Sequence, residues 1–334
     1  MFSRINKTVQ KLGSTSIPIL PSLLRNISSG QPFQTQYPSV KKQWASGIAY
    51  DDNAFDFDTS KISIDTIKAE FSQLGEGSIS LTKDQETGIA QLQLVNSRMK
   101  NAYSGKMMCD LNDAMIEMEN WKDGKGLVIL SDDPKFFSSG VDRSFIKCQN
   151  SYEGGYKMAT LMHDTMWRLS FLPMLTVSLI RGRALGGGAE ICTASDFRVF
   201  SPSGSLEFIQ AKLGLTSNYS GSRLVRLIGQ KEALKLLLSC RAINAREATN
   251  LGLCDLITYA EGDQATRETI LWLQEQFLNN VHIDVLHSMK GICQLSNLGG
   301  NLEENLENEK GQFTARWGQK LGPFATAINR NVKH

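Results

Sequence analysis

The sequence predicts an α/β fold followed by a helical C-terminal region. Between residues 89 and 258, short apolar strands alternate with stretches of helical spacing. Two glycine-rich turns each follow a predicted strand, and the pattern after Thr266 is helical. Alternating strands and helices are typical of an α/β core, and the final helices form a tail that is available for packing elsewhere.

The apolar pattern defines four elements before the first glycine-rich turn. A short helix is expected at 62–74 and is ended by glycines at positions 75 and 77. A half-buried strand is expected at 89–94, where apolar residues alternate with glutamines. Apolar residues at helical spacing predict a helix at 107–121. A short apolar run predicts a strand at 126–130, and the sequence Asp-Asp-Pro that starts at residue 132 ends it.

Further elements lie beyond the first turn. A helix is expected at 152–172, ended by Pro173, and a buried strand at 174–180. The second turn opens another helix, and a strand follows at 197–200. The last expected elements of the core are helices at 222–228 and 231–239 separated by Gly229, a helix with the capping box Asn244/Glu247 that ends at Gly252, and a strand at 253–258.

The first 60 residues lack sustained periodicity and are interpreted as a leader and linker. The core is then assigned to 61–260 and the helical region to 261–334. Residues 1–50 contain six basic residues, many serines and no acidic residue. This composition favours a mitochondrial presequence and therefore the mitochondrial matrix. A basic leader on a cytosolic protein is the alternative.

The rest of the chain excludes several classes of function. It holds 30 of the 36 basic residues and all 34 acidic ones, and this mildly acidic balance gives no footprint for nucleic acid. Six scattered cysteines and four histidines show no metal-binding spacing, so we expect reduced thiols and no metal site. No apolar run approaches the roughly 20 residues that span a bilayer, so no membrane partner is expected.

The two glycine-rich turns are the candidate chemical feature. The first is 136–142 and the second is 182–190, which contains three successive glycines at a helix start. Each glycine weakens a helix by about 1 kcal/mol relative to alanine. A helix start tolerates this where a ligand approaches the backbone closely. The free N–H groups there suit a developing negative charge.

The order and separation of these turns resemble the crotonase (enoyl-CoA hydratase/isomerase) superfamily over about residues 78–256. The resemblance implies a spiral core of ββα units and a C-terminal helical trimerisation region. It also implies an acyl-CoA substrate, a homotrimer or hexamer, and no separate cofactor, since coenzyme A is part of the substrate. The backbone N–H groups of Val141 and Gly187 match the oxyanion hole that binds the thioester oxygen in this superfamily.

The resemblance also carries over a set of substrate-binding positions. The segment 98–103 resembles the loop that holds coenzyme A in this superfamily. The expected substrate-binding residues are Arg98, Lys100, Ala102, Ser139, Gly140, Gly186, Gly188, Gln210 and Tyr219.

The catalytic carboxylates distinguish between the reactions of this superfamily. Its hydratases use two glutamates; the first matches Glu190, but the position of the second holds Gln210. Glutamine cannot exchange a proton near neutral pH, so hydration lacks its second acid–base carboxylate. Isomerisation is disfavoured as well, because many isomerases of the superfamily have their single base at this position. Decarboxylation of a malonyl-type thioester needs only an oxyanion hole for the enolate and one acid that protonates the α-carbon.

A closer resemblance supports this reaction. It covers the segments 97–99, 101–102, 119–121, 137–140, 184–190, 308–309 and 317–318. They resemble the members of the superfamily that remove carboxylate from ethylmalonyl-CoA, with methylmalonyl-CoA as a further substrate, in metabolite proofreading. An enoyl-CoA hydratase or isomerase is one alternative, and a non-catalytic binding module with the acyl-CoA fold is another.

Glu190 is the predicted acid, because partial burial raises the pKa of a carboxyl and favours its proton-donating form. The alternative is a glutamate that only complements the helix dipole. Asp142 is expected to cap backbone N–H groups rather than react. Turn geometry explains Ser138 and Ser139 without a nucleophilic role, and His163 is interpreted as a core or surface histidine.

Overall fold

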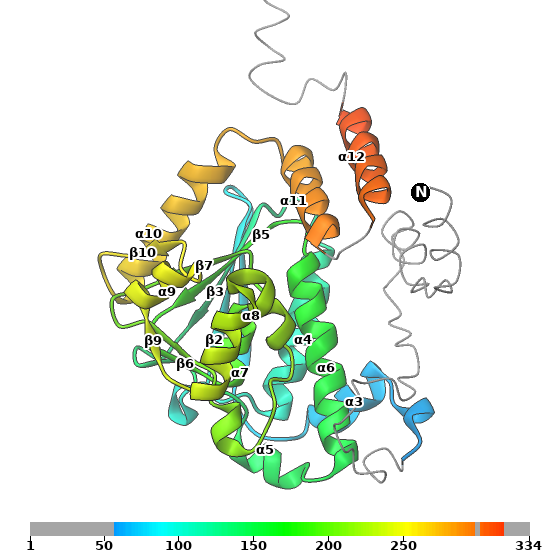
Figure 1. Ribbon diagram of the computed structural model, residues 1–334, viewed down its shortest axis with the longest axis vertical. Coiled ribbons are helices and arrows are strands. Elements are labelled where there is room, and N and C mark those ends of the chain that lie inside the picture. The colour runs from blue at the N-terminus through cyan, green and yellow to red at the C-terminus, as the bar shows by residue number, and fades with distance from the viewer. Residues whose placement is uncertain (1–56, 298–300, 317–334) are drawn as a thin grey trace, which may run out of the picture. The chain divides into compact units, whose positions relative to one another are not determined.

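The computed structural model describes residues 57–297 and 301–316. Its strands form two sheets, shown in Figure 1. The larger sheet has the order β1 (Ser78–Asp84), β2 (Ile89–Val95), β3 (Gly126–Ser131), β5 (Leu175–Ile180), β7 (Phe197–Phe200) and β10 (Leu256–Ile257). The smaller sheet has the order β4 (Phe136–Ser138), β6 (Arg183–Leu185), β8 (Ser205–Glu207) and β9 (Ile243–Asn244).

Both sheets are mainly parallel. In the larger sheet only β1 pairs antiparallel, with β2, and in the smaller sheet only β9 does, with β8. Three times the chain passes from a strand of the larger sheet to a strand of the smaller one: β3 to β4, β5 to β6, and β7 to β8. A helical segment follows each pair, which is the spiral of ββα units that the family resemblance implied.

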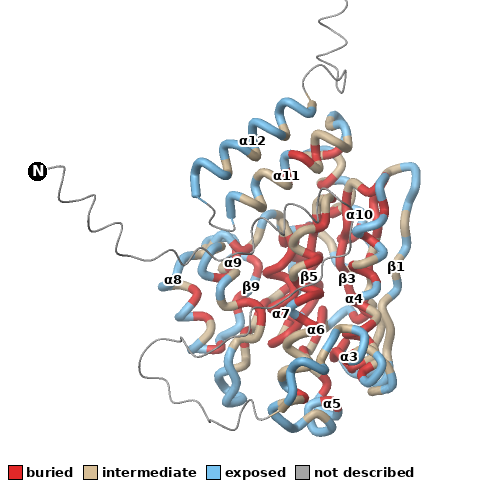
Figure 2. The backbone as a smooth tube through the Cα atoms, turned by 90° about the vertical axis from the view of Figure 1, so that its right-hand side faces the viewer, coloured by how far each residue is buried: buried red, intermediate tan, exposed pale blue. Residues whose placement is uncertain are grey.

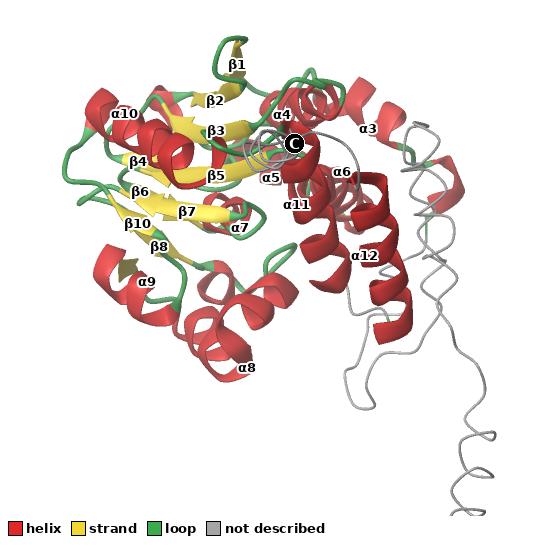
Figure 3. Ribbon diagram, turned by 90° about the horizontal axis from the view of Figure 1, so that it is seen from above, coloured by secondary structure: helices red, strands yellow, loops and turns green. Residues whose placement is uncertain are grey.

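Helices flank the strands, as Figure 3 shows from above. They are α3 (Ile64–Phe71), α4 (Gly105–Glu119), α5 (Arg143–Cys148), α6 (Tyr152–Phe171), α7 (Gly187–Cys192), α8 (Gly221–Ser239), α9 (Ala245–Leu251), α10 (Gly262–Leu273), α11 (Ile283–Asn297) and α12 (Leu302–Arg316). Short 3₁₀ segments lie at Thr59–Lys61, Ser97–Met99 and Gln210–Leu213, and a π-helical turn at Gln274–Leu278 extends α10. No helix in these described ranges is long and apolar enough to cross a membrane.

The central strands of the larger sheet are buried, as the colouring of β3 and β5 in Figure 2 shows. Along β3, Leu127 and Ile129 join the cluster that includes residues of α4 and α6, whereas Val128 and Leu130 join the cluster that includes residues of α10. Successive side chains of a strand point to opposite faces, so a strand covered on both sides needs a continuous apolar run. This explains the sequence of β3.

The structure confirms most of the expected elements. Gly229 breaks α8 with a φ of 79°, at the predicted point between two helices. The capping box of α9 is formed: the Asn244 side chain accepts from the Glu247 amide at 2.9 Å, and the Glu247 side chain accepts from the Asn244 amide at 3.1 Å. The strand expected at 253–258 is limited to β10. The proposed leader lies almost wholly outside the described residues, as does the end of the helical tail.

The first part of the helical tail packs on the core of its own chain. Lys290 of α11 is buried, and its Nζ lies 2.6 Å from the Met174 carbonyl oxygen and 2.7 Å from Asp196 Oδ2. His287 Nε2 lies 2.9 Å from the Gly124 carbonyl oxygen. These polar contacts hold α11 in place. No residue of α12 is buried, and the trimerisation of this region stays a prediction.

Replacing Lys290 by Met is expected to lower the free energy of unfolding by about 3 kcal/mol, because Asp196 then keeps a largely buried charge without its cation. Urea unfolding at fixed protein concentration measures this. The matched control is Lys310→Met, whose ion pair with Glu307 is about two-thirds exposed on both sides; its effect is expected to stay below about 0.5 kcal/mol. Equal effects in the two variants would show that the buried pair does not hold α11.

Candidate active site

The smaller sheet brings the two glycine-rich turns together. β4 and β6 are parallel neighbours, and so are β6 and β8. The segments that follow these strands therefore start at one edge of the sheet: 139–141, 186–188 and 208–210. Backbone contacts tie them, because the Gly186 amide donates to the Glu207 carbonyl oxygen at 2.8 Å. Both turns and the segment that carries Gln210 thus form one site.

Gly140 and Gly187 are in close backbone contact. A Cβ on Gly140 would lie 3.0 Å from the Leu185 carbonyl oxygen and 3.2 Å from the Gly187 amide nitrogen. Gly140 also has a φ of 89°, which side chains other than hydrogen rarely allow. Glycine is required here because the two turns touch through their main chains.

The Val141 and Gly187 amides form the candidate oxyanion hole. Among the described residues, neither amide donates any of the turn and loop hydrogen bonds of this region. Gly187 is the first residue of α7, where an amide has no intrahelical acceptor. The two residues are neighbours, since a Cβ on Gly187 would lie 3.7 Å from Val141 Cγ2. Two free donors, one of them at a helix start, suit a developing oxyanion.

The third glycine packs the turn against its neighbour. A Cβ on Gly188 would lie 2.7 Å from the carbonyl oxygen and from Cβ of Ser138. Ser138 itself donates to the Asn101 carbonyl oxygen at 2.6 Å and accepts from the Gly140 amide at 3.1 Å. Its hydroxyl therefore joins the backbone of the first turn to that of Asn101, in line with the predicted role in turn geometry.

Glu190 lies in the first turn of α7 and is 2% exposed. Its Oε1 accepts three hydrogen bonds from the loop before α8: from Ser217 Oγ at 2.7 Å, from the Asn218 amide at 3.0 Å and from Ser220 Oγ at 3.0 Å. We call this loop, residues 217–220, the carboxyl cradle. Sequence reasoning named Glu190 but missed the cradle.

Burial raises the pKa of Glu190 above its usual value, because removal from water penalises the charged form. The hydrogen bonds from Ser217, from Ser220 and from the loop backbone act in the opposite direction, since they stabilise the carboxylate. The net direction is upward. A carboxyl with a raised pKa therefore lies three residues beyond Gly187 of the candidate oxyanion hole, and a raised pKa is the property that a proton donor needs.

Tyr219 links the cradle to Gly187 of the candidate oxyanion hole. Its side chain is 5% exposed, and its hydroxyl donates to the Gly187 carbonyl oxygen at 3.1 Å. A Cβ on Gly187 would lie 3.0 Å from the same hydroxyl. Burial raises the pKa of Tyr219 far above its usual value, so the phenol stays neutral. Tyr219 therefore lies against Gly187, and its contact with substrate stays a prediction.

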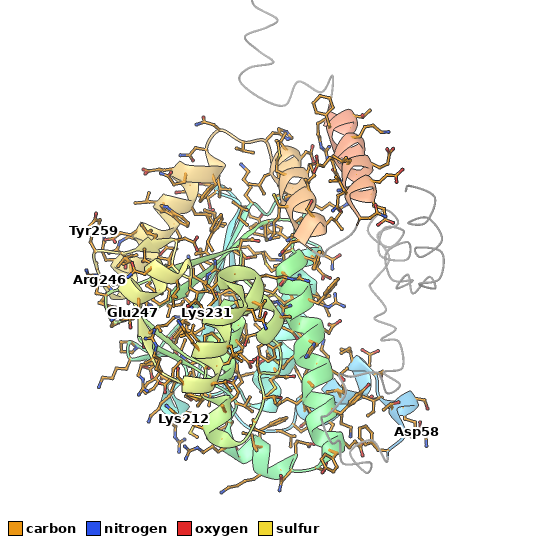
Figure 4. All side chains as sticks on the ribbon, in the orientation of Figure 1. Asp58, Lys212, Lys231, Arg246, Glu247 and Tyr259 are labelled. Carbon is orange, nitrogen blue, oxygen red and sulfur yellow. The ribbon has the colours of Figure 1, made fainter. Side chains whose placement is uncertain are left out.

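Gln210 begins the 3₁₀ segment that follows β8, at the same edge as the glycine turns. Its Oε1 is buried and has no hydrogen-bond partner within the described chain. Buried polar atoms in proteins nearly always have a partner, so a bound molecule or water is the expected one. Lys212, labelled in Figure 4, anchors this segment by donating to the Cys240 carbonyl oxygen at 2.7 Å.

The expected coenzyme A loop runs beside the first turn. The Ser139 amide donates to the Lys100 carbonyl oxygen at 2.9 Å, and the Tyr103 amide donates to the Gly140 carbonyl oxygen at 2.8 Å. Arg98 and Lys100 are exposed, and Lys100 Nζ lies 5.1 Å from the centre of the Phe136 ring. Both cations are therefore exposed beside the first glycine-rich turn. Ala102, by contrast, is buried.

Asp142 has the structural role that the sequence predicted. It is the N-cap of α5, and its Oδ1 accepts from the Ser144 amide at 2.7 Å and from Ser144 Oγ at 2.8 Å. Both interactions use the carboxylate as a cap. Within the residues that the structure describes, no cluster of three or more His, Cys, Asp or Glu side chains is arranged to hold a metal ion.

A separate cavity lies elsewhere in the molecule. It has a volume of about 340 Å³ and is lined by residues of β1, β2 and α10, among them Gln91, Asp263 and Arg267. It shares no residue with the glycine turns or the carboxyl cradle. We place the chemistry at the turns, because free backbone donors lie there near a buried carboxyl.

Known proteins are similar to this chain in sequence and in fold. The family model described as enoyl-CoA hydratase/isomerase matches residues 84–320. A Xenopus tropicalis protein named ethylmalonyl-CoA decarboxylase is 36% identical over 80% of this chain and 88% of its own length. The Homo sapiens protein of the same name is 35% identical over 75% of this chain and 81% of its own length.

Solved structures agree on the fold. An enoyl-CoA hydratase from Bacillus anthracis superposes with a TM-score of 0.64 at 24% identity, covering 71% of this chain and 89% of the other. One from Thermoplasma volcanium superposes with a TM-score of 0.65 at 21% identity, covering 77% and 97%. The sequence match and the shared fold together show that this chain belongs to the enoyl-CoA hydratase/isomerase family, the crotonase superfamily.

Proposed function

We propose that this protein decarboxylates a malonyl-type acyl-CoA thioester, with ethylmalonyl-CoA as the first substrate and methylmalonyl-CoA as the second. The observation that carries the proposal is the pairing of one buried carboxyl, Glu190, with an uncharged side chain, Gln210, at the edge that holds the oxyanion hole. One acid suffices for decarboxylation, whereas two-carboxylate hydration needs a second. The names of the relatives in Xenopus tropicalis and Homo sapiens support the same reaction.

The reaction places its charge at the oxyanion hole. When the bond between the α-carbon and the carboxylate breaks, carbon dioxide leaves and the electron pair stays with the thioester as an enolate. Its negative charge collects on the thioester oxygen, where the Val141 and Gly187 amides stabilise it. Loss of one such donor costs about 3–4 kcal/mol in well-studied enzymes. Uncharged surroundings at Gln210 also avoid repulsion of the substrate carboxylate.

Glu190 then completes the reaction. Its neutral form donates a proton to the α-carbon of the enolate and thereby becomes a carboxylate. The carboxylate takes up a proton from solvent before the next cycle. A neutral Glu190 is also favourable before the reaction, because an ionised one would repel the carboxylate of the substrate. The raised pKa that burial produces keeps more of the enzyme in this form.

The direct test incubates the purified protein with ethylmalonyl-CoA, methylmalonyl-CoA and crotonyl-CoA in separate reactions, and identifies the products by mass spectrometry. We expect butyryl-CoA from the first and propionyl-CoA from the second, without hydration of crotonyl-CoA. Hydration of crotonyl-CoA without decarboxylation would instead make this a hydratase. Retention on immobilised coenzyme A without any product would favour the non-catalytic binding module.

Replacing Gln210 by Glu is expected to create hydration of crotonyl-CoA at a rate at least about 100-fold above that of the unchanged protein, because it restores the missing second carboxylate. The same change is expected to slow decarboxylation, since a second carboxylate repels that of the substrate. Absorbance of the enoyl thioester follows hydration. Gln210→Asn, which adds no titratable group, is the control. If both variants leave hydration undetectable, Gln210 does not occupy the second catalytic position.

We also propose that the protein acts in the mitochondrial matrix, as a homotrimer or hexamer, and clears side products of acyl-CoA carboxylation. The basic, acid-free residues 1–50 support the location. Imaging of a C-terminal fluorescent fusion, with and without residues 1–50, tests it. Light scattering of the purified protein tests the assembly.

A further inference from the structure

The carboxyl cradle assigns different tasks to the two oxygens of Glu190. We infer that Ser217 and Ser220 are positioning residues: with the Asn218 amide they hold Oε1 as the accepting oxygen, so that Oε2 carries the proton that is delivered. This inference rests on the proposed function for the delivery step. The arrangement of the carboxyl itself follows from the contacts alone.

The hydrogen bonds of the cradle converge on one atom. Oε1 accepts from two hydroxyls and one amide, as described above. The two hydroxyls also touch each other, with 2.8 Å between Ser217 Oγ and Ser220 Oγ, and Ser217 Oγ accepts from the Ser220 amide at 3.3 Å. The three oxygens therefore form a closed triangle on one side of the carboxyl. This triangle fixes the rotation of the carboxyl plane.

The Asn218 amide decides where the proton of a neutral Glu190 resides. A hydroxyl can turn to donate or accept, but a backbone N–H can only donate. Its hydrogen points at Oε1 from 3.0 Å. A proton on Oε1 would oppose this fixed donor, whereas a proton on Oε2 leaves Oε1 as a carbonyl-type acceptor. The neutral carboxyl therefore carries its proton on Oε2.

Oε2 is open for the delivery of this proton. None of the three hydrogen bonds described above, from Ser217, Asn218 and Ser220, ends on Oε2. Oε2 is also not one of the fully buried polar atoms that lack a partner in that part of the chain. Since Oε2 has no hydrogen-bond partner within the described chain but is not among those atoms, part of its surface is accessible. The side chain as a whole is only 2% exposed, so the remaining access is narrow.

Other ionisable groups around the cradle come from three elements. Tyr219 is part of the loop itself, Arg223 of α8 donates to the Tyr219 carbonyl oxygen at 2.5 Å, and Arg223 also acts electrostatically on Glu190. His163 of α6 contacts the Asn218 carbonyl oxygen at 2.8 Å and Asn218 Oδ1 at 3.2 Å through Nε2. Both are acceptors, so this nitrogen carries a hydrogen. These groups are unchanged in serine variants, which therefore isolate the hydroxyls.

The hydroxyls have a defined effect on the pH dependence. Both stabilise the carboxylate and so lower the pKa of Glu190, against the larger effect of burial. Removing either one raises the pKa further. Because the delivering form is the neutral acid, the rate falls as pH rises through this pKa. The loss of a hydroxyl therefore moves the high-pH decline of kcat to higher pH.

The test compares kcat against pH for ethylmalonyl-CoA decarboxylation in Ser217→Ala, Ser220→Ala and Ser222→Ala. Ser222 is an exposed serine two residues beyond the cradle, in the first turn of α8, and its variant controls for the loss of a serine hydroxyl. In each cradle variant the high-pH decline is expected to move up by about one pH unit. Below the decline, kcat is expected to fall about tenfold, since the carboxyl is less well oriented.

Rescue and a second readout make the outcome decisive. Ser220→Thr keeps the hydroxyl and is expected to restore the pH profile of the unchanged protein. The infrared carboxyl band of Glu190, assigned by difference from Glu190→Gln, is expected to titrate at higher pH in both alanine variants, without any substrate. A uniform loss of kcat with an unmoved profile and band would reduce the serines to a structural role and overturn the inference.

The two proposals fail in distinguishable ways. If the unchanged protein does not decarboxylate ethylmalonyl-CoA but the infrared band moves as expected, the proposed reaction is wrong and the cradle stands. If decarboxylation occurs but neither profile nor band moves in the alanine variants, the cradle is wrong and the reaction stands. If kcat is unchanged in both variants at every pH, positioning by these hydroxyls is likewise refuted.

Discussion

Replacing Glu190 by Gln is expected to reduce kcat for decarboxylation by about 10²- to 10⁴-fold, the range for loss of a positioned general acid. Glutamine has the same shape, and its amide oxygen can still accept the three hydrogen bonds of the cradle. What is lost is the proton at Oε2. The binding of coenzyme A thioesters should change little, since the oxyanion hole and the turns are intact.

The measurement is steady-state kinetics from pH 5 to 9, with Glu117→Gln as the control. Glu117 is an exposed glutamate of α4 that pairs with Lys83, so its variant is expected to retain full activity. In the unchanged protein kcat should decline as pH rises through the raised pKa of Glu190, and Glu190→Gln should lack this decline. Full activity in Glu190→Gln would show that Glu190 is not the proton donor. The alternative that Glu190 only complements the dipole of α7 would then remain.

Replacing Gly140 by Ala is expected to reduce kcat by about 10²- to 10³-fold, through damage to the oxyanion hole. The added Cβ would lie 3.0 Å from the Leu185 carbonyl oxygen and 3.2 Å from the Gly187 amide nitrogen, both of them backbone atoms. Relief of these contacts must separate the two turns. The Val141 and Gly187 amides then no longer converge on one oxygen.

Gly252→Ala separates this effect from backbone strain. Gly252 ends α9 with a φ of 77°, close to the 89° of Gly140, but a Cβ there would meet no atom within 4 Å. Its variant is expected to lose about 1 kcal/mol of stability without loss of kcat. Kinetics and urea unfolding of both variants make the comparison. If Gly140→Ala keeps its kcat while its stability falls as in Gly252→Ala, the contact between the turns is not what catalysis requires.

Long elements of this fold could be predicted from the pattern of apolar residues. The break at Gly229 and the capping box of Asn244 and Glu247 followed from local chemistry that acts without tertiary context. β1 carries a readable signal as well, because Ile79 and Leu81 alternate with polar residues, and it was missed. The three-residue strands β4, β6 and β8 are too short to show a period.

Those short strands are the ones that build the site. The parallel neighbours β4, β6 and β8 set the glycine turns and Gln210 at one edge, so no periodicity argument could have joined Gly140 to Gly187. The family resemblance supplied this link instead. It also located Glu190, while the burial that raises the pKa of this carboxyl is visible only once α7 is packed.

The carboxyl cradle shows where the resemblance ends. Ser217 and Ser220 lie 27 and 30 residues beyond Glu190. Serines are common in loops, and nothing local distinguishes a hydroxyl that meets a distant carboxyl from one that meets water. Their role depends on the three-dimensional path of the loop before α8.

Isotope incorporation tests the central claim most directly. Ethylmalonyl-CoA is incubated with the protein in D₂O, and the acyl product is analysed by mass spectrometry. The account predicts butyryl-CoA with one deuterium at the α-carbon, formed in equal amount to the carbon dioxide released, and strongly reduced in Glu190→Gln. Ethylmalonyl-CoA that persists unchanged, while crotonyl-CoA is converted to 3-hydroxybutyryl-CoA, would contradict it.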